Sequence, residues 1–138
     1  MFFDNKEKIK DQDNDFIKVA ALLIHAAKID ENYSIEEEEI IKKTLIIIGV
    51  NKESLDKIIE EAIKIEKNAN QILDFTKEVK IMNENKKIEI IEALWKIIYS
   101  NKKADIYETN LMRRLAGLLY IDNKTMGDIK EKIRKNNS

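Results

Sequence analysis

The stretch Leu45-Ile46-Ile47-Ile48-Gly49-Val50-Asn51 aligns, 71 positions later, with Ala116-Gly117-Leu118-Leu119-Tyr120-Ile121-Asp122. In both segments an apolar run ends at a polar side chain that can cap a following helix. The same offset aligns residues 15–58 with residues 86–129 without a gap. Apolar, acidic and capping positions match together: Leu23 with Leu94, Ile58 with Ile129, Glu37 with Glu108, Ser34 with Asp105, and Ser54 with Thr125. Similarity at a fixed offset predicts a duplicated structural unit.

The apolar residues inside each copy recur at helical spacing. In the first copy they are Phe16, Val19, Ala20, Leu23, Ile24 and Ala27; in the second they are Ile88, Ile91, Leu94, Trp95 and Ile98. The chain has no proline and only three glycines, so only local capping interrupts its helices. The pattern predicts an all-α fold, a compact bundle of about seven helices built from two pseudo-symmetric repeats.

The 138 residues are enough for one domain with a substantial core. We expect an N-terminal arm over residues 1–13 and a single helical domain over residues 14–138, with a linker helix at about 69–80 between the copies. The expected helices begin at about Asn14, after a cap at Ser34, after a cap at Asn51, at about Ile72, at about Glu84, after a cap at Asp105 and after a cap at Asp122. Gly49 is placed to end the second of them.

Charge and residue usage argue against several functions. The 25 basic and 26 acidic residues give a net charge of −1, without the basic excess that neutralises phosphates, and Glu36-Glu37-Glu38-Glu39 would repel them. We therefore expect no nucleic-acid partner. There is no cysteine and only one histidine, His25, which we expect to be packed or at the core boundary. No nucleophilic triad, phosphate loop or multi-histidine set is present, so we expect no enzyme; paired carboxylates are the remaining catalytic route.

The longest apolar runs, Val19–Ile24 and Leu45–Val50, are far short of the ~20 residues that span a bilayer. The start Met1-Phe2-Phe3-Asp4 lacks the basic and apolar regions of a signal peptide. These features predict a soluble protein in the cytoplasm.

Two polar turns interrupt the apolar pattern at matching positions. In the first hinge, residues 30–37, Asp30 is followed seven residues later by Glu37; in the second, residues 101–108, Asn101 is followed by Glu108. A structural interpretation is sufficient for the glutamates, because Ser34-Ile35-Glu36-Glu37 and Asp105-Ile106-Tyr107-Glu108 both have the spacing of a capping box.

A functional interpretation treats the two hinges as one site. A twofold duplication would bring Asp30, Glu37, Asn101 and Glu108 together, and these four side chains offer the oxygen atoms that Ca²⁺ and Mg²⁺ prefer. The pattern is not an EF-hand loop, because Asp30-Glu31-Asn32-Tyr33-Ser34-Ile35 lacks the central glycine and the alternating ligands. Both interpretations stay open at the level of sequence.

At the hinges the chain resembles the tellurite-resistance TerB family, which carries two copies of Ala-Asp-Gly-x-x-x-x-x-Glu between helices. The matching residues are Ala27-Lys28-Ile29-Asp30-Glu31 with Glu37, and Leu94–Asn101 with Glu108 and Leu111–Ala116. The resemblance covers roughly residues 14–131. It implies two pseudo-symmetric helical units in a non-enzymatic, stress-associated bacterial protein, with a divalent-cation site that would fall on Asp30, Glu37 and Glu108.

The sequence departs from the family pattern at three positions. Glu31 and Lys102 stand where the family has glycine, and Asn101 stands where it has the second aspartate. The loss of one carboxylate, with Lys102 and Lys103 beside it, predicts weaker cation binding than the family pattern supports.

Two functions remain as expectations. The first is a small module that senses a divalent cation, Ca²⁺ or Mg²⁺, at the paired hinges. The second is an adaptor without an ion, which would dock on a protein partner or at a membrane surface through an apolar groove or through Phe2 and Phe3.

Overall fold

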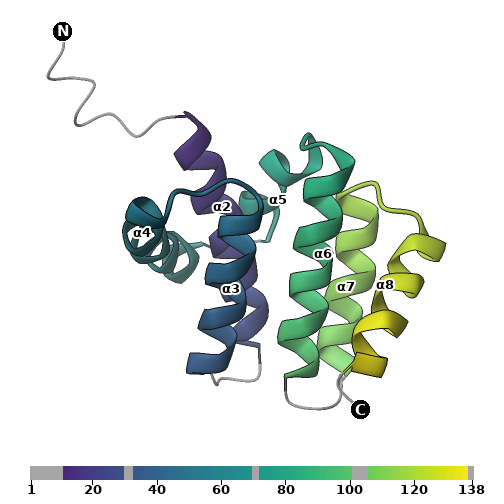
Figure 1. The fold of residues 1–138 in the computed structure, drawn as a ribbon. Coiled ribbons are helices and arrows are strands. Elements are labelled where there is room, and N and C mark those ends of the chain that lie inside the picture. Colours follow the sequence, from purple (N-terminus) through teal and green to yellow (C-terminus); the bar gives the residue numbers. More distant parts are fainter. Residues whose placement is uncertain (1–10, 30–32, 70–71, 101–105, 137–138) are drawn as a thin grey trace, which may run out of the picture.

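The computed structural model describes residues 11–29, 33–69, 72–100 and 106–136. Within these ranges the regular structure is seven α-helices and one 3₁₀ turn, and no strand (Figure 1). The elements are α2 (Asp11–Ala27), α3 (Ile35–Ile47), η1 (Lys52–Ser54), α4 (Leu55–Asn68), α5 (Leu73–Lys80), α6 (Glu84–Tyr99), α7 (Ile106–Leu118) and α8 (Asn123–Asn136). The predicted all-α bundle of about seven helices is confirmed.

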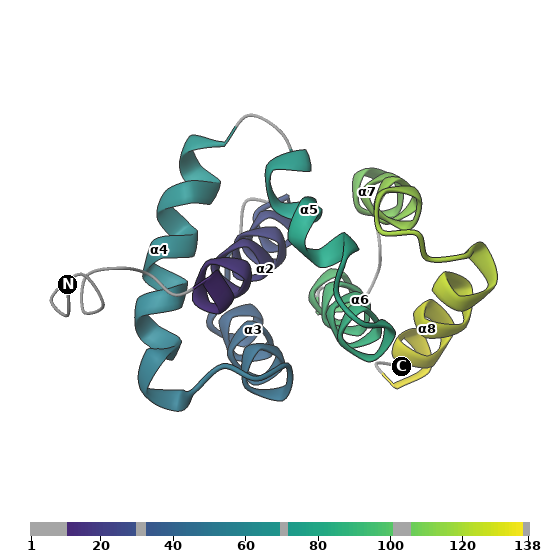
Figure 2. The ribbon, with the colours of Figure 1, turned by 90° about the horizontal axis from the view of Figure 1, so that it is seen from above.

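Helix α2 forms the centre of the core. It packs against α3, α4, α5 and α6, which lie around it when the molecule is seen from above (Figure 2). All six residues from Val19 to Ile24 are completely buried. A helix that is apolar on every side must be enclosed by other elements, and the unbroken apolar run Val19-Ala20-Ala21-Leu22-Leu23-Ile24 therefore dictates this central position.

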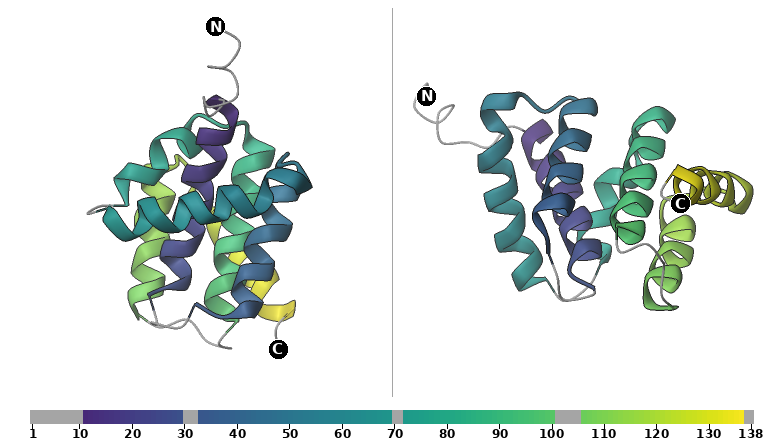
Figure 3. Two further views of the ribbon diagram at one scale, coloured as in Figure 1. Left: turned by 90° about the vertical axis from the view of Figure 1, so that its left-hand side faces the viewer. Right: turned by 60° about the horizontal axis from the view of Figure 1, so that its bottom comes forward.

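The other helices are arranged so that the helix ends on either side of both hinges lie at one end of the molecule. Helix α4 crosses the outer side of α2 and α3, and α8 packs on α6 (Figure 3). Helices α3 and α6 lie side by side and run in opposite directions (Figure 1). The ends of α2 and α6 and the beginnings of α3 and α7 all lie at the lower end of the molecule in Figure 1.

Local structure repeats with the sequence offset at the ends of α3 and α7. Gly49 (φ 122°) and Tyr120 (φ 59°), which the alignment pairs, are the two described residues with positive φ. The amide that follows each of them donates to the carbonyl five residues back, Val50 to Leu45 and Ile121 to Ala116, both at 2.9 Å. These bonds close a helix with a left-handed residue, as a C-terminal capping motif requires. The symmetry of the two repeats as a whole stays a prediction.

Alanine substitutions at Gly49 and Gly117 are expected to have opposite effects on stability. At Gly49 a side chain would be forced into a glycine-only conformation, and Gly49→Ala should cost about 1–3 kcal/mol. Gly117 lies inside α7, and no atom beyond its own helical backbone comes within 4 Å of the place that a Cβ would take. Gly117→Ala should therefore add roughly 0.5–1 kcal/mol. Urea denaturation of both variants checks this, and a neutral Gly49→Ala would contradict the strained turn.

Three expected helix boundaries or caps can be compared with the structure. The described part of helix α2 begins at Asp11, earlier than the expected start at about Asn14. The predicted cap at Asn51 is wrong: its side chain makes no capping bond, a 3₁₀ turn follows, and α4 begins only at Leu55. Asp122 does cap α8, since its Oδ1 accepts from the amide of Thr125 at 2.7 Å.

Trp95 and His25 lie where the sequence places them. Trp95 is buried, its Nε1 lies 3.3 Å from the Met126 sulfur, and its ring stacks on Tyr99 with centroids 5.9 Å apart. His25 is partly buried at the edge of the core, with Nδ1 3.2 Å from Glu66 Oε2. Both residues are therefore part of the packing and its boundary, as expected.

Lys87 is a buried residue that periodicity does not predict. Its Nζ donates to the carbonyl of Leu119, near the end of α7, at 3.1 Å. The alignment pairs Lys87 with Phe16, whose ring lies against Gly49 at the end of α3. The same position thus supports the same helix end in both copies, by an apolar contact in one and by a hydrogen bond in the other.

No helix in the described ranges combines the length and the apolar character needed to cross a membrane.

Candidate functional site

The first hinge is closed by a complete capping box. Ser34 has an extended backbone, and its Oγ accepts from the amide of Glu37 at 3.1 Å. In return Glu37 Oε1 accepts from the amide of Ser34 at 2.8 Å. The glutamate is 2% exposed, although it lies in the first turn of a surface helix. The structural interpretation of this hinge is confirmed, and it accounts for one of the two carboxylate oxygens.

The second carboxylate oxygen of Glu37 faces the other copy. Glu37 Oε2 lies 3.5 Å from the Oγ of Ser100, which follows the last residue of α6 and directly precedes the second hinge. The Ser100 hydroxyl also donates to the carbonyl of Ile97 at 2.6 Å. Because a hydroxyl has one proton, the shorter bond takes it, and the approach to Glu37 is a weak contact. This contact brings the carboxylate of the first hinge to the residue from which the second hinge continues.

Glu108 occupies the corresponding place in the second hinge. It lies in the first turn of α7 and is 4% exposed, so both aligned glutamates are buried carboxylates at the start of a helix. Asp30 and Asn101, the other two predicted ligands, lie outside the described residues, as does the predicted cap Asp105. The structure therefore positions two of the four predicted oxygen donors.

Tyr33 adds to the polar character of the first hinge. Its hydroxyl donates to Glu38 Oε1 at 3.3 Å. Burial raises the pKa of the Tyr33 phenol well above its ordinary value, and the negative charges of Glu38 and Glu37 raise it further. The phenol thus stays protonated and donates to the Glu38 carboxylate.

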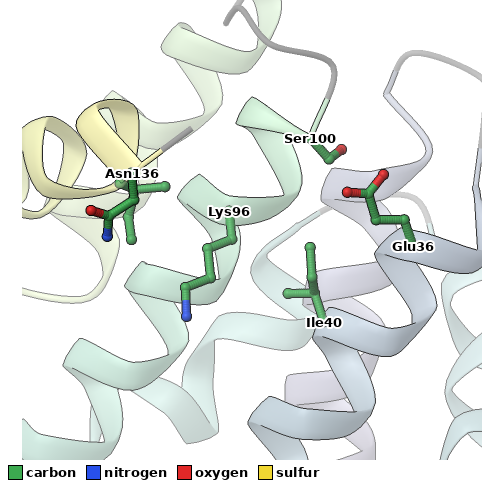
Figure 4. Close-up of a pocket in the computed structure, with 6 residues that line it drawn as sticks. Glu36, Ile40, Lys96, Ser100 and Asn136 are labelled. Carbon is green, nitrogen blue, oxygen red and sulfur yellow. The ribbon is translucent and has the colours of Figure 1, made fainter. Parts of the chain in front are cut away.

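A small hollow opens beside the hinges, between α3, α6 and α8 (Figure 4). Its volume is about 170 Å³. It is lined by Glu36 and Ile40 from α3, Lys96 and Ser100 at the end of α6, and Ile133 and Asn136 from α8. Ser100 is therefore shared between this hollow and the contact with Glu37.

The donor chemistry of the hinges suits a hard divalent cation, which takes oxygen ligands. Each carboxylate oxygen has two lone pairs, so Glu37 Oε2 can accept a further interaction while Oε1 holds the capping bond. Within the described residues no three His, Cys, Asp or Glu side chains form a metal-binding group. A complete set would need Asp30 and Asn101 in addition to the two buried glutamates.

Comparison with known proteins assigns the family. A family model described as tellurite resistance protein TerB matches residues 16–131. The chain belongs to the TerB family. The matched range contains both hinges and the ends of all the helices that flank them, which confirms the resemblance found at the hinge residues. Comparison of this TerB-family chain with curated proteins and with solved structures gives no match.

Two contributors to the TerB hinge region, Ser100 and Tyr33, are not predicted from the sequence. Ser100 lies 63 positions from Glu37, and nothing in its spacing indicates that the two side chains approach each other. For Tyr33 a local signal exists, because it lies five positions before Glu38, and a residue that enters a helix often interacts with its first turn.

Proposed function

We propose that this TerB-family protein senses a divalent cation at its paired hinges, without catalysing a reaction, as part of a bacterial stress response in the cytoplasm. The observation that supports the proposal is the buried Glu37 carboxylate, whose Oε2 lies 3.5 Å from the Oγ of Ser100, the last described residue before the second hinge. Asp30, Glu37, Asn101 and Glu108 are the residues that would hold the ion.

The capping box sets a limit on how Glu37 can take part. Oε1 is engaged with the amide of Ser34, so Oε2 is the atom that would bind a cation. The N-terminus of helix α3 carries a partial positive charge, which opposes the binding of a cation there. With Asn101 in place of a carboxylate, we expect affinity near the weak end of the range for protein sites, at about 10⁻⁴–10⁻³ M.

We propose that cation binding changes how the protein interacts with a protein partner. Helix α3, which Glu37 opens, ends in Ile46 and Ile47, and both isoleucines are exposed at the opposite end of the helix. Exposed apolar side chains on the helix that carries the sensing residue support a docking role for this helix. The predicted arm residues Phe2 and Phe3 lie outside the described residues.

Titration with CaCl₂ or MgCl₂, followed by ¹⁵N NMR, tests the cation proposal. We expect the amide signals of Ser34, Glu37, Ser100 and Glu108 to move at about millimolar cation. Glu37→Gln keeps the capping geometry, since glutamine also serves in a capping box, and should weaken binding about tenfold or more.

Glu36→Gln is the matched control, because it removes a neighbouring exposed carboxylate in the same helical turn. It should leave cation binding nearly unchanged. The sensing proposal is wrong if the hinge amides do not move, or if both variants bind the cation equally well.

A further inference from the structure

The hollow between α3, α6 and α8 carries two opposite charges that are not paired with each other. Glu36 and Lys96 are exposed, and neither takes part in an ion pair within the described part of the chain. In Figure 4 they stand on opposite walls: the Glu36 carboxylate lies beside Ser100, and the Lys96 side chain extends along α6 away from it. The lining also contains Ile40 from α3 and Ile133 from α8, which contribute its apolar part.

We propose that this hollow binds a small ω-amino carboxylate, a molecule with an ammonium group and a carboxylate joined by a short alkyl chain. Glu36 would pair with the ammonium group, and Lys96 with the carboxylate. The Asn136 amide, which belongs to α8 and lies on the far side of Lys96 from Glu36 in Figure 4, can donate a hydrogen bond to that carboxylate. The alkyl chain would cover Ile40 and Ile133.

The size and charge of the hollow select this class of ligand. Its volume of about 170 Å³ lies below the roughly 300–1,000 Å³ of sites that bury drug-sized molecules, so the hollow would not enclose a nucleotide or a larger cofactor. A ligand with only one charge would be attracted by one of the two side chains, Glu36 or Lys96, and repelled by the other. A zwitterion of suitable length satisfies both walls at once and adds apolar contact between them.

This site is separate from the proposed cation site and uses different atoms. The zwitterion would contact Glu36 and Lys96, whereas the cation would contact Glu37 Oε2. Ser100 borders both, so the two ligands can influence each other, but neither requires the other.

The test uses the full chain in EDTA and 6-aminohexanoate as the probe, followed by ¹⁵N NMR. We expect the amide signals of Glu36, Lys96 and Asn136 to move with a Kd of about a millimolar. Hexanoate and hexylamine have the same alkyl chain with one charge each, and each should bind about fivefold more weakly. A series with 4-aminobutyrate and 5-aminovalerate gives the length that best spans the two walls.

Variants separate a specific site from general surface binding. Lys96→Met keeps the apolar stem and helix propensity, and Glu36→Gln keeps the size of the side chain. Each variant should weaken the binding of 6-aminohexanoate about three- to fivefold. Lys86→Met, on the same helix at a different hollow, and Glu37→Gln should leave its binding unchanged.

The proposal is overturned if the hollow's amides do not move at tens of millimolar probe. It is also overturned if hexylamine or hexanoate binds as well as 6-aminohexanoate, or if Lys96→Met binds like the wild type. Since EDTA is present throughout, failure here would not bear on the cation proposal, and failure of the cation titration would not bear on this one.

Discussion

Replacing Leu23 or Leu94 with alanine is expected to destabilise the protein by about 2–5 kcal/mol in each case. The two leucines are aligned positions of the two copies, and both are completely buried, in α2 and α6. Alanine removes the apolar area and leaves a cavity that close-packed neighbours cannot fill. Because α2 is enclosed on more sides than α6, we expect Leu23→Ala to fall in the upper part of this range.

Chemical denaturation followed by circular dichroism measures both values. Leu73→Ala is the matched control, since Leu73 is 45% exposed in α5 and should cost less than about 1 kcal/mol. A neutral result at Leu94 would contradict the packing of α6 against the rest of the core.

Trp95→Ala is expected to cost about 3–5 kcal/mol, an effect as large as that of Leu23→Ala. The indole fills the space between α6 and α8, where its Nε1 meets the Met126 sulfur and its ring stacks on Tyr99. Lys130 Nζ lies 5.4 Å from the ring centroid and loses a cation–π contact as well.

Trp95→Phe separates these contributions, because it keeps an aromatic ring but removes the N–H group and part of the volume. Its cost should be clearly smaller than that of Trp95→Ala. Trp95 is the single tryptophan of the chain, so the transition must be followed by circular dichroism and not by tryptophan fluorescence. Equal costs for the two variants would show that ring packing does not hold α8 in place.

The helices that carry both an apolar period and a side-chain cap are predicted closely by the sequence. Helix α6 has the expected start, and the box at Ser34 and Glu37 opens α3 as expected. In these cases local chemistry and tertiary packing require the same boundary. Sequence does not distinguish Asn51 from Asp122, because both residues can cap, and only the carboxylate does so here.

The site is predicted in part, and for a clear reason. The positions of Glu37 and Glu108 follow from local spacing, which is why both lie in first turns as expected. The approach of Ser100 to Glu37 depends on how α3 and α6 pack, and no local pattern encodes it. Lys87 is a similar case. Its charge predicts a solvent-exposed side chain, whereas its alignment with Phe16 at the 71-residue offset indicates a buried position, which is the one it has.

The enclosed position of α2 limits how independently the two aligned halves of the chain can fold. This helix belongs to the first copy, yet it also packs against α6 of the second. A fragment restricted to the first copy would expose that side of α2 to water, and we expect it to be poorly folded. We therefore expect the two aligned halves of the chain to fold as one cooperative unit, in which loss of order in either half removes support from the other.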